Sequence, residues 1–216
     1  IDVGKDGRLS FVAAIDRNPA EATYLYEIVR KTAAPVAAAV MPYVERQFSP
    51  GLVSVLYDDR GEVVELVGWA DAEKRIPMSM DRMHMICSQT KGVCGVAAAI
   101  LIEDGLLRLD DPVIKYLPEF KDATLTVRHL LTHTSGLPFE SPEKKRLGWT
   151  GVSLADQAAA AARYPQRKAS GAFFAYSNWG MDCAARVVEV ASGLGFDEFL
   201  EKRLFRPLGM SDTTFN

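Results

Sequence analysis

The chain has 216 residues, of which 48% are hydrophobic and 25% are charged, and its formal net charge is -3. These proportions are ordinary for a globular protein and exclude a disordered tail or a collagen-like fibre. With 25 basic against 28 acidic residues and no long basic block, the composition argues against nucleic acid as a partner.

The longest apolar run covers residues 33–44 and is interrupted by Pro35 and Pro42. A membrane-spanning helix needs about 20 apolar residues, so we expect no span here, and the run lies too far from the N-terminus for a signal peptide. Because the chain begins with Ile1, we expect that an upstream segment was removed. The compartment stays open between cytoplasmic and periplasmic or secreted.

Three cysteines occur, at Cys87, Cys94 and Cys183. The odd number and the lack of a C-x-x-C pair disfavour a disulfide framework and a thiolate zinc site. Cys87 and Cys94 have apolar neighbours, which predicts that both are small buried residues.

Residue patterning predicts a helix, then a β-hairpin, then mainly helices. Residues 19–48 favour a helix with a kink between Pro35 and Pro42. Residues 51–57 and 62–70 are typical of two strands of a hairpin. Two strands alone are marginal in water, so the sheet looks incomplete within this chain.

The second part of the chain favours helices. Residues 92–102 hold no charged residue, which predicts a buried helix, and Gly105 provides its left-handed cap. Further helices are expected over residues 126–133, from a capping box at Ser153 to about Pro165, over 179–192 with Gly193 closing it, and over 196–205.

The leading candidate for chemistry is the S-x-x-K tetrad from Ser88 to Lys91. Residues three apart on a helix lie one turn apart on the same face, so the Lys91 ammonium can reach the Ser88 hydroxyl. A serine hydroxyl needs a neighbour that takes its proton, and a lysine does so once burial or a nearby cation lowers its pKa. Chance matches to S-x-x-K are common, but a lysine beside a long charge-free helix is costly without a role.

A second candidate is the Y-x-N motif formed by Tyr176, Ser177 and Asn178. A phenol beside Lys91 could move protons to and from Ser88, and an amide can hold a substrate carbonyl. Taken alone, the motif is also typical of a helix N-cap.

His129 and His133 are four residues apart, which is metal-ligand spacing on a helix. Neither a glutamate between them nor a nearby third ligand supports a metal site. A structural role at a helix end and turn is favoured, and no metal or organic cofactor is implied.

The two motifs together resemble those of the penicillin-binding and serine β-lactamase-like hydrolases, which include class C β-lactamases, D,D-peptidases and family VIII carboxylesterases. The segments 104–113, 117–120, 126–138 and 207–210 are also similar to family signatures. The resemblance implies an α/β (α+β) fold, with an antiparallel sheet flanked by helices and a mostly helical domain. It divides the chain into residues 1–87 of the α/β domain, 88–195 of the nucleophile helix and helical domain, and 196–216, which return toward the α/β domain.

The resemblance also implies the roles of individual residues. Ser88 becomes the acylated nucleophile, Lys91 and Tyr176 the proton-transferring pair, and Asn178 a contact to substrate and to Lys91. Which of Lys91 and Tyr176 is the base in each step stays open. The expected substrate is a small-molecule ester, a β-lactam or a D-Ala-D-Ala peptide.

One departure from the family pattern concerns its third motif, K-T-G or H-T-G, for which no match follows Tyr176. That motif lies on a strand that supplies an oxyanion-hole amide. We therefore expect this chain to be the N-terminal portion of a larger hydrolase, with the C-terminal half on a second chain or absent. The alternative is a non-catalytic penicillin-binding or scaffold module with the same fold.

Overall fold

The computed structural model describes residues 2–3, 9–10, 35–58, 61–141, 152–164 and 168–215. Most of the helix predicted over residues 19–48 lies outside this part of the chain. The chain divides into two compact units, Ile1–His84 and Met85–Asn216, and each is described by itself. Among the described residues, no helix combines the length and apolarity needed to cross a bilayer.

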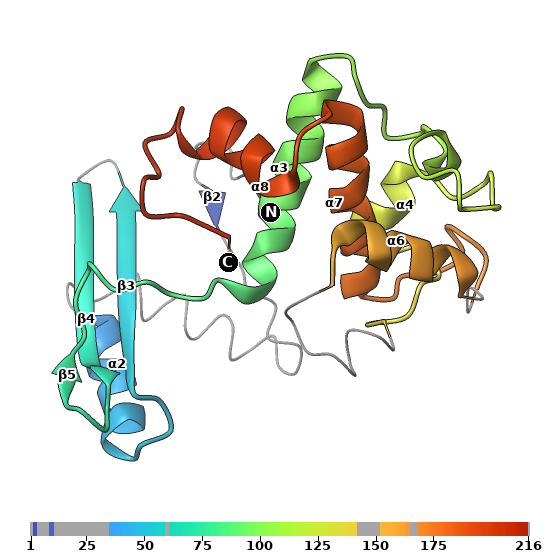
Figure 1. The fold of residues 1–216 in the computed structure, drawn as a ribbon. Helices are drawn as coiled ribbons and strands as arrows, with labels where there is room; N and C mark the ends of the chain where they lie inside the picture. Colours follow the sequence, from blue (N-terminus) through green and yellow to red (C-terminus); the bar gives the residue numbers. More distant parts are fainter. Residues whose placement is uncertain are drawn as a thin grey trace. The chain divides into compact units, whose positions relative to one another are not determined.

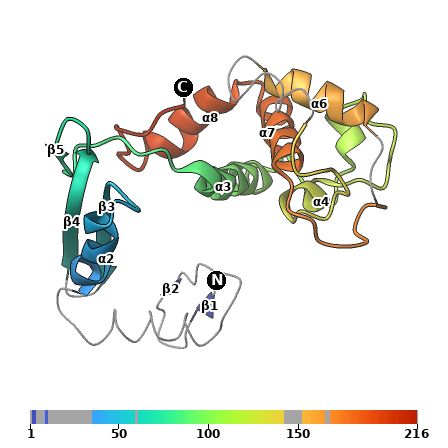
Figure 2. The same ribbon diagram turned by 90° about the horizontal axis from the view of Figure 1, so that it is seen from below.

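The first unit is built on an antiparallel sheet with the order β3-β4-β5. Strand β3 (Gly51–Asp58) pairs with β4 (Gly61–Asp71), which confirms the predicted hairpin, and β4 pairs with a short strand β5 (Ile76–Pro77) that the sequence did not reveal. Helix α2 (Pro35–Glu45) lies along this hairpin (Figure 2). The two-residue strands β1 (Asp2–Val3) and β2 (Leu9–Ser10) pair with each other.

One glycine of this sheet is required by its conformation. Gly68 has φ of +73°, and a Cβ atom there would lie 2.4 Å from the backbone oxygen of Pro50. The left-handed region disfavours side chains, and the contact leaves no room for one. The glycine thus permits the close approach of the chain at the beginning of β3.

The second unit is a helical bundle arranged around α7 (Asn178–Ser192), which contacts α3 (Thr90–Glu103), α4 (Val127–Leu131) and α6 (Leu154–Arg163) (Figure 1). Helix α7 contributes nine buried residues, including Trp179, whose indole N–H donates to the Gln157 carbonyl of α6 at 2.8 Å. Short 3-10 helices cover Cys87–Gln89 (η1) and Val113–Lys115 (η2). Ser177, just before α7, and Trp179, at its start, are both buried, so the packing of this helix positions the segment that precedes it.

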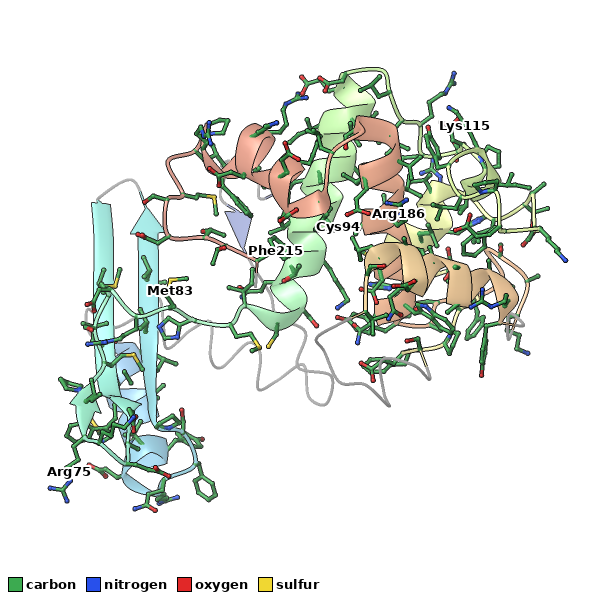
Figure 3. All side chains as sticks on the ribbon, in the orientation of Figure 1. Arg75, Met83, Cys94, Lys115, Arg186 and Phe215 are labelled. Atoms are coloured by element: carbon green, nitrogen blue, oxygen red, sulfur yellow. The ribbon has the colours of Figure 1, made fainter. Side chains whose placement is uncertain are left out.

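The chain then returns along the bundle through α8 (Phe196–Leu200) and a π-helical turn, η3 (Glu201–Phe205). Phe215, labelled in Figure 3, packs its ring against Phe196 and Phe205, with centroids 5.6 Å and 6.4 Å away. Residues 196–215 therefore pack within the helical unit.

Helix ends agree with their predicted capping residues. The Ser153 hydroxyl accepts from the Asp156 N–H at 3.1 Å at the start of α6, and Gly193 closes α7 with φ of 72°. Gly105, which follows the C-cap residue Asp104 of α3, has φ of 74°. Side-chain oxygens that satisfy free N–H groups and glycines in the left-handed region explain where these helices begin and end.

Candidate active site

Ser88 and Lys91 meet at the start of α3. Ser88 lies in the 3-10 turn η1, and Lys91 lies one turn further along, in the first turn of α3. The Lys91 ammonium donates to the Ser88 Oγ at 3.2 Å. The spacing of three residues thus produces the contact that the tetrad predicts.

The residue before Ser88 differs from the prediction. Cys87 is exposed and has φ of 46°, whereas Cys94 is 3% exposed and belongs to the core. The prediction that both are buried was wrong for Cys87, because it precedes α3 in a turn outside the buried face. Burial raises the pKa of the Cys94 thiol to about 12.

Tyr176 approaches the pair from the segment before α7. The Lys91 Nζ lies 4.9 Å from the centre of the Tyr176 ring. Partial burial raises the pKa of the Tyr176 phenol, but hydrogen bonds with Ser88 and Lys91 and the charge of Lys91 outweigh it, so the pKa lies below its ordinary value. Ser88 and the positively charged Lys91 thus stabilise the phenolate relative to that of an isolated tyrosine.

Asn178 is the first residue of α7 and is 9% exposed. Its backbone N–H donates to the Phe139 carbonyl at 2.8 Å. The preceding Ser177 is the N-cap, since its Oγ accepts from the Gly180 N–H at 2.9 Å. The capping interpretation is therefore confirmed for Ser177, while the contact between the Asn178 amide and Lys91 stays a prediction.

Ser88 and Lys91 are more exposed to solvent than the sequence predicts. Ser88 is exposed and Lys91 is partly buried. Helix α3 buries one face, with Leu101 fully covered, while Val96 on the same helix is 43% exposed. The expectation of a helix buried on all sides is therefore met on one face only, because no described element covers the other.

His133 lies next to the site, although the sequence analysis placed it only in a structural role at a helix end and turn. Its ring centroid lies 4.5 Å from that of Tyr176, with 31° between the planes. Its Nδ1 accepts from the Ser177 N–H at 3.2 Å. Burial and the charge of Lys91 lower the pKa of His133. The spacing of His129 and His133 does not predict the contact between His133 and Ser177, because Ser177 lies 44 residues away in the sequence.

The other histidine of the pair has a local role. His129 Nδ1 accepts from the Thr126 N–H at 3.2 Å, at the N-terminus of α4. Across the residues that the structure describes, no group of three His, Cys, Asp or Glu side chains could hold a metal ion. Both histidines accept a backbone N–H through Nδ1, His129 from Thr126 and His133 from Ser177.

A family model described as Beta-lactamase matches residues 36–216. The chain belongs to the β-lactamase family. This membership fits the helical unit that carries the S-x-x-K and Y-x-N motifs and the antiparallel sheet of the first unit, which is incomplete compared with a full β-lactamase-like fold.

The proteins that this β-lactamase-family chain is similar to include a peptidase, an amidase and a hydrolase with acyltransferase activity. It is 29% identical over 182 residues to the D-alanyl-D-alanine-carboxypeptidase/endopeptidase AmpH of Escherichia coli, covering 76% of this chain and 45% of AmpH. The D-amino acid amidase of Ochrobactrum anthropi superimposes with a TM-score of 0.73 at 25% identity, covering 81% of this chain and 49% of the amidase. EstCE1, described as a hydrolase with promiscuous acyltransferase activity, gives a TM-score of 0.69 at 26% identity, with coverages of 80% and 50%.

The chain spans less than half the length of the curated relatives that it matches. The covered share is 45% for AmpH and 31% for protein flp of Staphylococcus aureus.

Proposed function

We propose that the protein is a serine hydrolase that cleaves an ester or amide through an acyl-enzyme. The observation that carries the proposal is the contact of the Ser88 Oγ with the Lys91 Nζ at 3.2 Å, next to a phenol whose pKa is lowered. A hydroxyl becomes a useful nucleophile when a group in hydrogen-bond reach takes its proton. Membership of the β-lactamase family supports this chemistry.

The reaction runs in two balanced halves. In the first, the Ser88 oxygen bonds to the substrate carbonyl carbon as its proton passes to the Lys91–Tyr176 pair. The tetrahedral intermediate then collapses, the bond to the leaving group breaks, and the pair returns the proton to that group. In the second half, the pair takes a proton from water, the hydroxide attacks the acyl carbon, and Ser88 leaves with the proton restored.

The remaining roles concern the carbonyl oxygen and the substrate. The backbone N–H of Ser88 supplies one half of the oxyanion hole, and the Asn178 side chain binds the substrate beside Lys91. Loss of one oxyanion donor costs about a hundredfold in rate or more, so the second donor matters.

The same proposal includes the extent of the enzyme: this chain forms its N-terminal portion, and further polypeptide supplies the second donor. Three observations support this. The chain spans under half of its curated relatives, β3 has a strand partner on one side in the described sheet, and the apolar Val96 on α3 is exposed.

Covalent labelling of the full-length protein, meaning residues 1–216 with any polypeptide that accompanies them, tests the nucleophile. A fluorophosphonate and a β-lactam should both label Ser88, as located by peptide mass spectrometry. The Ser88→Ala variant should lose the label and all turnover, whereas Ser192→Ala, at the end of α7, should keep both. Turnover that survives in Ser88→Ala would refute the assignment.

Substrate class follows from three assays side by side: a p-nitrophenyl ester, a chromogenic cephalosporin and a D-Ala-D-Ala peptide. We expect turnover of at least one ester or amide. A stable β-lactam adduct on Ser88 without turnover of any substrate would indicate the non-catalytic penicillin-binding module instead. Intact-mass analysis of the active sample tests whether the enzyme extends beyond this chain. We expect the active species to contain further polypeptide, because residues 1–216 alone should be inactive.

A further inference from the structure

His133 holds both sides of the backbone around Tyr176. The His133 carbonyl accepts from the Ala175 N–H at 2.8 Å, and the His133 Nδ1 accepts from the Ser177 N–H at 3.2 Å. The residue between these two anchors is Tyr176, and its ring lies 4.5 Å from the imidazole. One residue therefore fixes the chain on either side of the phenol and also contacts the phenol ring.

The backbone of His133 is adapted to this arrangement. His133 follows the end of α4 and has φ of 58°, in the left-handed region. Only a few residue types, with asparagine and histidine among them, adopt this region at low cost. The conformation directs the carbonyl and the imidazole of one residue toward the same neighbouring segment.

The imidazole is neutral in this arrangement. A protonated ring carries a hydrogen on both nitrogens and accepts no hydrogen bond, so the contact from the Ser177 N–H requires a deprotonated Nδ1. Among the residues that the structure describes, the charged or titratable groups that face His133 are the Lys91 ammonium from α3 and the Tyr176 phenol from the segment before α7. Burial of the ring and the Lys91 charge both favour the neutral form.

We propose that His133 is a positioning residue, whose neutral imidazole holds the Tyr176 phenol against Ser88 and Lys91. This proposal rests on the hydrolase function proposed above. When His133 gains a proton, the Ser177 N–H loses its acceptor and a second positive charge lies beside Lys91. The segment then no longer holds the phenol in place, and the proton-transfer step slows.

Two variants of the full-length protein separate the contact from simple folding effects. His133→Asn keeps a side-chain acceptor close to the position of Nδ1, and asparagine tolerates a positive φ. His133→Gly tolerates the same φ but removes the acceptor and the ring. The matched controls are His129→Asn and His129→Ala, because His129 also accepts a backbone N–H at 3.2 Å through Nδ1, but at the start of α4.

We expect His133→Gly to lower kcat by about tenfold or more with little change in KM, since small misplacements of a catalytic group are costly. His133→Asn should stay within about threefold of the unmodified kcat. Its kcat should also persist to lower pH, because the amide does not gain a proton. The His129 variants should alter the melting temperature but leave kcat and the pH profile unchanged.

The proposal is overturned if His133→Gly keeps kcat, if His133→Asn is as slow as His133→Gly at equal melting temperature, or if the acid side of the profile is the same in His133→Asn and the unmodified protein. If His133→Gly fails to fold, the pH profile of His133→Asn decides. Labelling of Ser88 distinguishes the two proposals. If Ser88 is labelled and the protein is active, but the His133 variants keep the unmodified kcat and pH profile, only the positioning role is refuted. If Ser88 is not labelled, the proposed hydrolase function itself is refuted.

Discussion

The Lys91 ammonium lies 4.9 Å from the centre of the Tyr176 ring, and the same ammonium donates to the Ser88 Oγ at 3.2 Å. One cation thus contacts both the Ser88 hydroxyl and the Tyr176 ring, the two groups that the proposed mechanism uses. Because Lys91 stands on α3 and Tyr176 precedes α7, the packing of these two helices determines the geometry of the site.

Replacing Tyr176 by phenylalanine tests the phenol without removing its ring. Tyr176→Phe keeps the packing against His133 and against Phe139, whose ring lies 6.1 Å away. General acid–base groups contribute about 10²- to 10⁴-fold, so kcat should fall by that factor. Steady-state kinetics with a p-nitrophenyl ester measures the change.

The control for this variant is Tyr164→Phe, since Tyr164 packs edge-on against Trp179 with centroids 5.3 Å apart, outside the site. It should keep kcat. Equal rates of Ser88 acylation in Tyr176→Phe and the unmodified protein would remove Tyr176 from the proposed mechanism.

The ionisation of Tyr176 depends on its two donors. Hydrogen bonds with Ser88 and Lys91 and the Lys91 charge stabilise the phenolate, so the phenol should ionise below the ordinary pKa of about 10. Removing the cation in Lys91→Met destabilises the phenolate, and the pKa should rise. Phenolate therefore forms at lower pH in the unmodified protein than in the variant.

Ultraviolet titration measures this shift without any turnover. The chain has seven tyrosines, so the titration of Tyr176→Phe is subtracted to isolate one phenol. Lys115→Met is the control, because Lys115 lies over the ring of Tyr116, 4.9 Å from its centre, and leaves Tyr176 alone. An unchanged pKa for Tyr176 in Lys91→Met would contradict the prediction.

Local chemistry explains what the sequence could predict. The start of α6 follows from the Ser153 cap, the end of α7 follows from Gly193, and the contact of Ser88 with Lys91 follows from their separation of three residues. Each of these features depends on residues within one helical turn.

What the sequence could not predict depends on distant contacts. Strand β5 has two residues, too few for an alternating pattern, and exists through its pairing with β4. The contact of His133 with Ser177 joins positions 44 residues apart, and no periodicity records it. The exposure of Val96 depends on what packs over α3, which a charge-free sequence does not specify.

The N-cap of α7 should be a major source of local stability. The Ser177 hydroxyl is fully buried, accepts from the Gly180 N–H at 2.9 Å and donates to the Pro138 carbonyl at 2.6 Å. Ser177→Ala removes the cap and leaves a buried carbonyl unpaired, so the free energy of unfolding should fall by about 2–3 kcal/mol.

Urea unfolding of Ser177→Ala and Ser153→Ala measures the difference. Ser153 caps α6 in the same manner but is exposed, so its loss should cost only about 0.5–1 kcal/mol. Equal losses in the two variants would show that burial of the Ser177 hydroxyl adds nothing beyond the cap.

The three thiols should differ sharply in reactivity. Cys87 is exposed, whereas Cys94 and Cys183 are buried and burial raises the pKa of both thiols. Since the thiolate is the reactive form, an aromatic disulfide reagent should modify one thiol per native chain quickly and all three after unfolding. The fast reaction should vanish in Cys87→Ala and persist in Cys183→Ala. A fast native reaction at Cys94 would mean that the contact between α3 and α7, the helices that place Lys91 close to Tyr176, opens readily.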